Sequence, residues 1–358
     1  MQKYKLNAIN IRKTYDDITA LKSASIQLKE GEFLTLLGPS GSGKTTLLMA
    51  IAGLNSPDSG EIWIDGELAT HLPPFKRDLG MVFQNYALFP HMTVFDNIAF
   101  PLRMRKNKAS VIKEEVMKVL DIVELGHVAN RYPKELSGGQ QQRIALARCF
   151  VYKPSIILMD EPLGALDKKL RDSLQREIKK LHENLGITVL YVTHDQEEAM
   201  VMSDRICVMN NGEIDQIGTP AELYFQPSTV FSADFLGESN LFSGTVSSIN
   251  EQEVEVVGPS GMVIKGMSKV PVNTGDEVKF MVRPESVDLN ALETEENVTH
   301  GTLTEVIVSG QITKLFAELA DGTEMMSTQL TRTSEHTLRV GAKVSLSWRA
   351  SNTVILIS

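Results

Sequence analysis

The sequence predicts an α/β domain built on a mostly parallel sheet, followed by a smaller all-β domain. In residues 1–237, short apolar runs alternate with stretches of helical period, an order typical of parallel strands that helices cover on both faces. A glycine-rich turn joins one of these runs to the helical stretch after it. In residues 238–358, short β-rich pieces are separated by glycine, proline and asparagine turns. That pattern predicts a small barrel or sandwich.

Three apolar runs predict buried strands, and each is followed by a helical pattern. Residues 33–38 lead through the glycine-rich turn into the apolar helical stretch 45–54. Residues 155–160 precede a long amphipathic stretch with Leu170, Leu174, Ile178 and Leu181 on one face. Residues 187–194 precede a helical stretch at 196–203. The β-rich pieces of the second domain are residues 254–258, 277–282, 304–310, 343–348 and 353–357.

Length and charge restrict the class of protein. At roughly 150 residues per domain, the 358 residues suffice for about two domains that each bury a core. The hydrophobic share of 42% and the charged share of 23% are typical of globular chains. The 36 lysines and arginines against 45 acidic residues give a net charge of −9. This charge disfavours general nucleic-acid binding, because neutralising phosphates needs an excess of basic side chains.

Cysteine content and the amino terminus indicate the compartment. Cys149 and Cys207 lie beside apolar residues with no second cysteine at metal-ligand spacing, so we expect neither a zinc site nor a disulfide framework. The first ten residues lack the apolar core of a signal peptide, and no apolar run approaches the ~18 residues that span a bilayer. We therefore expect a cytosolic chain that does not itself cross a membrane.

Residues 38–45, GPSGSGKT, match the pattern G-x-x-x-x-G-K-[ST] between a predicted strand and a predicted helix. The glycines let backbone N–H groups converge on phosphate oxygens, and the helix points its positive end toward them. Lys44 would supply charge to the β and γ phosphates of ATP, and Thr45 would bind Mg²⁺. The alternative is a simple glycine turn. The predicted ATP-binding residues of this loop are Gly38, Ser40, Gly41, Gly43, Lys44, Thr45 and Thr46.

Two carboxylates follow the second apolar run. Asp160 ends the run and Glu161 comes directly after it. A carboxylate at the carboxyl end of a strand beside a phosphate loop suits an Mg²⁺ site, and the next one can accept a proton from an attacking water. We therefore predict that Asp160 belongs to the Mg²⁺ site and that Glu161 is the general base. The alternative is an ordinary Asp-Glu-Pro helix start.

A second helix start also suits an anion. Small residues precede the helical stretch QQQRIALARCF and would leave backbone N–H groups exposed at its positive end. This second cradle lies nearly a hundred residues from the first and has no cations of its own. Two such cradles suit a site that two copies of the chain assemble head to tail across a two-fold axis. The predicted ATP-binding residues here are Ser137, Gly138, Gly139 and Gln140.

The segment LSGGQ, residues 136–140, together with the phosphate loop, resembles the signature of the ATP-binding cassette (ABC) family. The cassette and the β-rich tail resemble, over the whole chain, the ATPase subunits of bacterial importers of the maltose, iron and polyamine type. The resemblance implies a P-loop NTPase cassette at residues 1–237, with a helical subdomain at about 88–150. It implies an OB-like (TOBE) regulatory and dimerisation domain at residues 238–358.

The resemblance also implies partners and a location. Two cassettes of a homodimer would sandwich two ATP molecules with Mg²⁺ and drive two integral-membrane permease subunits. An extracytoplasmic solute-binding protein would deliver the solute, and the ATPase would lie peripherally on the cytoplasmic face of the inner membrane. The stretch QNYALFPHMTV and the length favour polyamine (spermidine or putrescine) uptake. Importers of iron(III), aminophosphonate, thiamine or sugar remain alternatives.

Further positions match the family one by one. Gln84 resembles the glutamine that reaches Mg²⁺ and the attacking water; a buried loop amide is the alternative. Tyr15 resembles the aromatic that stacks on adenine; a core tyrosine is the alternative. His194 follows a strand where its ring could meet the γ-phosphate; a core histidine is the alternative. Asp167, with Ala165 and Leu166, resembles the loop that crosses to the other subunit.

Three other features complete the comparison. Gly164 stands where many relatives have serine, which puts a hydroxyl contact there in doubt. Residues 103–108 are expected to form a solvated basic face, and the family places residues 95–130 against the permease. Arg283-Pro284-Glu285 resembles the RPE element of the OB-like domains. That tail lacks an aromatic and basic strand face, so we expect no nucleic-acid partner.

Two functions outside transport are alternatives. A cassette ATPase that acts on nucleic acid or ribosomes would carry long coiled coils, zinc cysteines or tandem cassettes, none of which the sequence contains. A P-loop kinase would transfer the γ-phosphate to an acceptor, but it would not carry LSGGQ. The sequence therefore favours ATP hydrolysis that drives transport.

Overall fold

The computed structural model of the chain describes residues 4–164, 167–251, 253–289, 296–331 and 339–357. The chain divides into two compact units, which meet in sequence at Pro220 and Ala221. Each unit has its own apolar core, and each is described here by itself. In the described part of the chain, no helix is both long and apolar enough to cross a bilayer.

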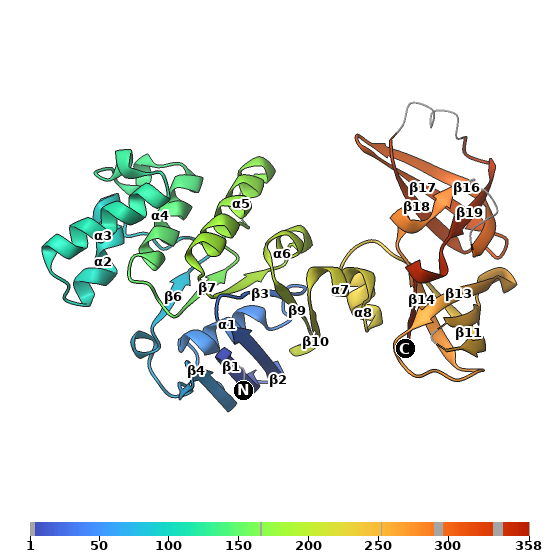
Figure 1. The fold of residues 1–358 in the computed structure, drawn as a ribbon, viewed down its shortest axis with the longest axis horizontal. Helices are drawn as coiled ribbons and strands as arrows, with labels where there is room; N and C mark the ends of the chain where they lie inside the picture. The colour runs from blue at the N-terminus through green and yellow to red at the C-terminus, as the bar shows by residue number, and fades with distance from the viewer. Residues whose placement is uncertain (1–3, 165–166, 252, 290–295, 332–338, 358) are drawn as a thin grey trace. The chain divides into compact units, whose positions relative to one another are not determined.

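The first unit contains a six-stranded sheet in the order β10-β9-β3-β8-β7-β6 (Figure 1). Its strands are β3 (Phe33–Leu37), β6 (Leu79–Val82), β7 (Ile156–Asp160), β8 (Val189–Thr193), β9 (Arg205–Asn210) and β10 (Glu213–Gly218). From β9 to β6 all neighbours are parallel, and β10 is antiparallel to β9. Every residue of β3 and β8 is buried, as expected for strands covered on both faces. The predicted mostly parallel sheet is confirmed.

A second, antiparallel sheet lies in the same unit and has the order β2-β1-β4-β5. Its strands are β1 (Tyr4–Tyr15), β2 (Ile18–Lys29), β4 (Ser59–Ile64) and β5 (Glu67–Leu68). The sequence did not predict this sheet. The register of β1 against β2 shifts at several points, and each shift interrupts the strict alternation by which a half-buried strand is recognised.

Helices α1 (Lys44–Ala52), α5 (Lys168–Leu185) and α6 (Gln196–Met202) follow β3, β7 and β8. On α5, Leu174 and Ile178 are buried and Leu170 and Leu181 are partly buried against the same cluster, so the predicted apolar face is confirmed. A separate group consists of α2 (Val94–Met104), α3 (Ala109–Ile122) and α4 (Gly138–Phe150) (Figure 1). These three share one apolar core. Short 3-10 helices occupy Pro74–Lys76, Gly126–Val128 and Pro133–Glu135.

The second unit consists of two small β-sheets and two short helices. A closed barrel has the order β11-β12-β13-β20-β14, and a five-stranded sheet has the order β15-β19-β16-β17-β18. Both sheets contribute to one core, which includes Phe280 and Trp348, so the expected all-β domain is confirmed. The elements are α7 (Pro220–Phe225), α8 (Val230–Phe235), β11 (Asn240–Asn250), β12 (Glu253–Val257), β13 (Val263–Ser268), β14 (Glu277–Val282), β15 (Asp288–Leu289), β16 (Asn297–Ser309), β17 (Ile312–Leu319), β18 (Glu324–Leu330), β19 (Lys343–Trp348) and β20 (Thr353–Leu356), with 3-10 helices at Pro259–Gly261, Pro284–Ser286 and Ala350–Asn352.

A buried arginine explains where the second unit begins. Arg283 is only 3% exposed, and its guanidinium donates to the carbonyl oxygens of Ala233, Gly237 and Glu238 at 3.0, 3.2 and 3.1 Å. It also donates to the carbonyl of Tyr224 and lies over that residue's ring. These bonds join α7 and α8 to the barrel. The compact unit therefore starts at Ala221, whereas the boundary predicted at residue 238 falls just before β11.

Candidate nucleotide-binding site

The loop between β3 and α1 contains two glycines at which an added Cβ would clash with neighbouring backbone. Gly43 has a φ of 100°, and a Cβ there would lie 2.6 Å from the carbonyl oxygen of Ala20. A Cβ on Gly38 would lie 2.2 Å from the carbonyl oxygen of Met209. The backbone is thus pressed against its neighbours and curls tightly before the first turn of α1. Such a curled loop at a helix start is the geometry that presents N–H groups to a phosphate.

Lys44 lies inside this loop. Its side chain is 5% exposed, and its Nζ donates to the carbonyl oxygens of Gly38 and Pro39 at 2.8 and 2.9 Å. Burial lowers the pKa of Lys44, while the negative charges of Glu161 and Asp160 oppose that shift. The loop therefore holds a desolvated ammonium group close to two carboxylates, where phosphate oxygens would be strong partners.

Asp160 and Thr45 meet across the site, from the end of β7 and the start of α1. The hydroxyl of Thr45 donates to Oδ1 of Asp160 at 3.1 Å. Burial raises the pKa of Asp160, the Thr45 hydrogen bond lowers it, and the charge of Glu161 raises it. A hydroxyl and a carboxylate side by side supply the oxygen ligands that Mg²⁺ prefers, so this pair fits a magnesium ion.

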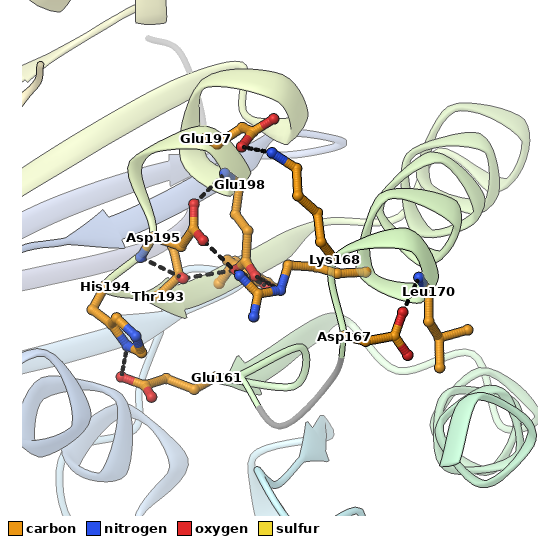
Figure 2. A network of polar contacts seen from close by, with 11 residues as sticks. Glu161, Asp167, Lys168, Leu170, Thr193, His194, Asp195, Glu197 and Glu198 are labelled. Atoms are coloured by element: carbon orange, nitrogen blue, oxygen red, sulfur yellow. Dashed lines mark hydrogen bonds and ion pairs between the residues drawn. The ribbon is translucent and has the colours of Figure 1, made fainter. Parts of the chain in front are cut away.

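The side chains of Glu161 and His194 are in contact at the ends of β7 and β8 (Figure 2). His194 Nδ1 lies 3.1 Å from Oε1 of Glu161, and the two side chains are 55% and 23% exposed. Glu161 also has a φ of 44°, a backbone conformation that is uncommon for a residue with a side chain. Its N–H donates to the carbonyl of Val192 in the neighbouring strand at 3.0 Å. Backbone strain of this kind clusters at functional sites.

Gln84 lies near the same carboxylate, on the loop after β6. A Cβ built on Gly164 would be 3.9 Å from Nε2 of Gln84 and 3.9 Å from Oε2 of Glu161. The amide and the carboxylate therefore flank one small space. Gln84 is exposed, which argues against the alternative of a buried loop amide.

Tyr15 lies at the end of β1 and is 42% exposed, so it is not a core tyrosine. Its hydroxyl accepts a hydrogen bond from Nδ2 of Asn55 at 2.9 Å. Nζ of Lys13 lies 5.3 Å from the centre of its ring. An exposed ring of this kind has the area to cover a base.

The second predicted cradle lies at the start of α4. Ser137 and Gln140 form a reciprocal cap: Oγ of Ser137 accepts from the Gln140 N–H, and Oε1 of Gln140 accepts from the Ser137 N–H at 3.0 Å. Ser137 and Gly138 are exposed, whereas Gly139 is buried against Leu170 of α5. Figure 1 shows α4 grouped with α2 and α3 and apart from α1. The second cradle therefore starts a helix of this group, whereas the first cradle starts α1.

Asp167 begins α5. Its Oδ1 accepts from the N–H of Leu170 at 3.1 Å (Figure 2), so its carboxylate caps the helix. Ala165 and Leu166, predicted to belong to the same loop, lie outside the described residues.

The sequence did not single out Arg171, Asp195 and Glu198. They form a half-buried charge cluster beside His194. One signal was available, because Asp195 and Glu198 have the spacing of a helix cap with an acidic residue three positions later, and α6 does start there. The pairing with Arg171 could not be found, because it depends on how α5 packs against α6.

These features are those of a P-loop ATPase: a phosphate loop with a buried lysine, a hydroxyl–carboxylate pair, and a glutamate directly after that carboxylate at the end of β7. Residues 21–164 match the family described as "ABC transporter", and residues 280–356 match the "TOBE domain". Together with the relatives described next, these matches show that the chain belongs to the ATP-binding subunits of ABC transporters. It is an ATPase that uses ATP with Mg²⁺.

Two relatives illustrate the extent of the similarity. The chain is 44% identical over 332 residues to "Spermidine/putrescine import ATP-binding protein PotA" of Fusobacterium nucleatum, which covers 91% of this chain and 88% of that protein. It is 43% identical over 351 residues to the protein of the same name from Marinobacter nauticus, covering 97% and 94%.

Solved structures resemble the first part of the chain. The dimeric post-hydrolysis state of the ATP-binding cassette MJ0796 bound to ADP and Pi has a TM-score of 0.54 at 37% identity, and it covers 60% of this chain and 98% of that one. The structure of cbiO1 from Clostridium perfringens, described as part of the ABC transporter complex cbiONQ, has a TM-score of 0.58 at 28% identity and covers 62% of this chain and 90% of that one. Both support the cassette fold found here.

Proposed function

We propose that the chain is the ATP-hydrolysing subunit of an importer and that two copies bind two ATP molecules between them. The observation that carries this proposal is the separation of the two cradles. Lys44, Asp160 and Glu161 accompany the first cradle, whereas the second, at residues 137–140, lies on a different part of the same unit. A second copy placed head to tail would bring the second cradle to the first.

Each residue of the site has a distinct role in this proposal. The ammonium of Lys44 binds the β and γ phosphates, which take the place of its present carbonyl partners. Glu161 accepts the proton of the attacking water, and His194, which touches Glu161, donates to the γ-phosphate. Tyr15 stacks on adenine. The remaining ATP contacts of one copy come from Gly38, Ser40, Gly41, Gly43, Thr45 and Thr46, and those of the other copy come from Ser137, Gly138, Gly139, Gln140 and Asp167.

Thr45, Asp160 and Gln84 would hold Mg²⁺, and they supply the oxygen ligands that the ion prefers. When bound, the ion neutralises charge that develops on the phosphate oxygens. Gln84 also lies close enough to Glu161 to orient the water that Glu161 deprotonates.

The Glu161→Gln variant tests the assignment of the base. Glutamine keeps the shape of the side chain but cannot accept a proton, so ATP binding should persist while turnover falls by roughly a hundredfold or more. The measurements are ATP affinity and phosphate release by the full chain. Glu197→Gln is the matched control, because Glu197 is 63% exposed and pairs only loosely with Lys168 at 3.7 Å. Near wild-type turnover in Glu161→Gln would overturn the assignment.

The Ser137→Arg variant tests the two-copy site. An arginine at this exposed position would fill the second cradle but leave the first cradle of the same chain intact. We expect normal ATP binding to one chain and no ATP-dependent association, measured by light scattering in the Glu161→Gln background. If ATP still brings this variant together, the second cradle does not face the first.

For the transported solute, we propose a polyamine such as spermidine or putrescine. The names of the relatives and the resemblance over the whole chain support this choice. The chain would act at the cytoplasmic face of the inner membrane with two permease subunits, which receive solute from an extracytoplasmic binding protein. The helical part at about residues 88–150 would contact the permease, and residues 238–358 would serve homodimer and regulatory contacts.

The solute can be tested in the assembled transporter. The chain would be purified from membranes with its permease, and the reconstituted complex would be screened for solutes that stimulate ATP hydrolysis. Spermidine or putrescine with the binding protein should stimulate hydrolysis. Stimulation by iron(III), an aminophosphonate, thiamine or a sugar instead would replace the polyamine proposal, while the ATPase assignment would stand.

A further inference from the structure

A cluster of charges connects the first turn of α5 to the loop that carries His194 (Figure 2). Arg171 Nη1 donates to Oδ2 of Asp195 at 2.8 Å, and Arg171 Nε lies 3.7 Å from Oε1 of Glu198. The side chains of Arg171 and Asp195 are each 27% exposed, and that of Glu198 is 2% exposed. Burying charged groups costs desolvation free energy, which offsets much of their mutual attraction. The cluster therefore contributes little net stability to the fold.

On the side of β8, three contacts fix Asp195, which directly follows His194 in the chain. Its N–H donates to Oγ1 of Thr193 at 3.0 Å. Its Oδ1 accepts from the Glu198 N–H at 3.1 Å and caps α6, while its Oδ2 holds Arg171. These contacts restrain the backbone on both sides of His194.

Glu198 completes this side of the cluster. Its Oε2 accepts from the hydroxyls of Tyr191 and Thr193, both at 2.7 Å, within the buried strand β8. Burial raises the pKa of Glu198, and the two hydroxyl bonds oppose that shift. The start of α6 and the end of β8 are therefore joined by buried hydrogen bonds, and they form a firm support for the loop between them.

On the side of α5, Arg171 belongs to the turn that Asp167 begins. The Arg171 N–H donates to the carbonyl of Asp167 at 2.9 Å, and the Asp167 carboxylate caps the same turn. One ion pair therefore connects the start of α5 to the residue after His194. His194 in turn lies against Glu161.

We propose that Arg171 and Asp195 are positioning residues that hold His194 against Glu161 and tie its position to the first turn of α5. This inference rests on the proposed roles of Glu161 and His194 in ATP hydrolysis. Arg171 and Asp195 contact each other, Glu198 and the ends of α5 and β8, so in this proposal they act on hydrolysis through His194 and leave nucleotide binding to Lys44 and its loop.

The test uses variants that remove the charges but keep the shapes. Arg171→Met retains much of the aliphatic stem, and Asp195→Asn retains an oxygen that can still cap α6. In the full chain with Mg²⁺, we expect each to lower kcat by about tenfold, which is roughly 1.4 kcal/mol. KM and the affinity for ATP should stay within about twofold. The double variant should lose no more than Arg171→Met alone, because Arg171→Met already breaks the contact with Asp195.

The control is another ion pair between the same two helices. Lys168 and Glu197 lie 3.7 Å apart and are 78% and 63% exposed (Figure 2). Lys168→Met and Glu197→Gln each remove one charge without touching the support of His194, so kcat should not change. Equal losses in these variants and in Arg171→Met would overturn the proposal in favour of a general effect of α5 and α6.

The decisive comparison places Arg171→Met in a His194→Ala chain. If Arg171 acts through His194, it should have no further effect on kcat once the imidazole is gone. A full tenfold loss in that background would overturn the proposal, as would unchanged kcat of Arg171→Met in the wild-type chain. Retained hydrolysis by Glu161→Gln and His194→Ala would instead refute the proposed function on which the inference rests.

Discussion

At the scale of single residues, the strongest feature is a buried ammonium that donates to two carbonyl oxygens. Lys44 occupies the centre of the loop between β3 and α1, and burial lowers its pKa. A desolvated cation gains more from a phosphate than an exposed one does, because water no longer competes for it.

We therefore expect Lys44→Ala to weaken ATP binding. Loss of a charge-assisted contact costs roughly 1.5–3 kcal/mol, which corresponds to a rise in Kd of about tenfold to a hundredfold. Lys118→Ala is the control, because Lys118 is 56% exposed on α3. Titration with a fluorescent ATP analogue measures both variants, and an unchanged Kd in Lys44→Ala would refute the assignment of the loop.

The two cysteines allow a prediction about reactivity and pH. Burial raises the pKa of Cys149 to about 11 and that of Cys207 to about 12, from an ordinary value of 9.0. The thiolate is the reactive form, so iodoacetamide at pH 8 should label neither thiol in the native chain and both after unfolding in guanidinium. Stoichiometric labelling of the native chain, detected by mass spectrometry, would contradict the burial of these residues.

The raised pKa of Cys149 also makes the free energy of unfolding depend on pH. Because the folded-state pKa is higher than the unfolded value, the folded chain binds more protons between about pH 9 and 11. This contribution to the free energy of unfolding is therefore fully present below pH 9 and decreases as the pH rises through that range.

The candidate residues differ in how far the sequence predicted them. The phosphate loop follows a pattern that local chemistry dictates, and Asp160 and Glu161 are placed by the end of an apolar strand. The contact between His194 and Glu161 and the pairing of Arg171 with Asp195 join different strands and helices. Such contacts follow from packing, which a single sequence does not display.

At the scale of elements, the turn before α1 needs glycine for two separate reasons. Gly43 has a left-handed backbone, and a Cβ would meet the Ala20 carbonyl at 2.6 Å and the Leu21 side chain at 2.8 Å. Gly41 has a φ of 84° but no atom within 4 Å of an added Cβ. Alanine at position 41 would therefore suffer backbone strain alone, whereas alanine at position 43 would suffer both backbone strain and a steric clash.

We expect Gly43→Ala to lower the Tm clearly more than Gly41→Ala. Strain alone costs roughly 1–2 kcal/mol for alanine in this conformation, and only Gly43→Ala adds a clash with backbone. Calorimetry of the full chain measures both variants. Equal shifts in Tm would show that the loop relaxes away from β2 and would contradict the close approach described here.

Arg283 plays a comparable role in the second unit, where it satisfies carbonyls at the ends of α7 and α8. Arg283→Met would leave these buried acceptors without donors, at a cost of roughly 3 kcal/mol. Denaturant unfolding can be followed by the fluorescence of the buried Trp348 in a Trp63→Phe chain. Arg339→Met, at an exposed position, is the control, and equal stability of the two variants would contradict this role.

The elements show where periodicity suffices and where it does not. Continuous apolar runs predicted β3, β7 and β8, because strands buried on both faces need no alternation. The antiparallel sheet of β1, β2, β4 and β5 was missed, since register shifts break its period of two. The bonds between Arg283 and the helices α7 and α8 connect residues far apart in sequence, so periodicity does not reveal them.

At the scale of the whole molecule, the described residues place the proposed catalytic groups beside the first cradle and not beside the second. The residues that we propose to bind and hydrolyse ATP lie at the ends of β3, β7 and β8, whereas the 137–140 cradle starts α4 of the helical group. The central claim is that two copies of the chain share each ATP molecule.

The most direct measurement of this claim is an experimental structure of the Glu161→Gln chain with ATP and Mg²⁺ at saturating concentration. We predict that Lys44 of one copy and Ser137 of a second copy contact the γ-phosphate of the same ATP molecule, in two equivalent sites. An ATP molecule whose γ-phosphate is contacted by one polypeptide alone, under the same conditions and with the permease present, would contradict the account.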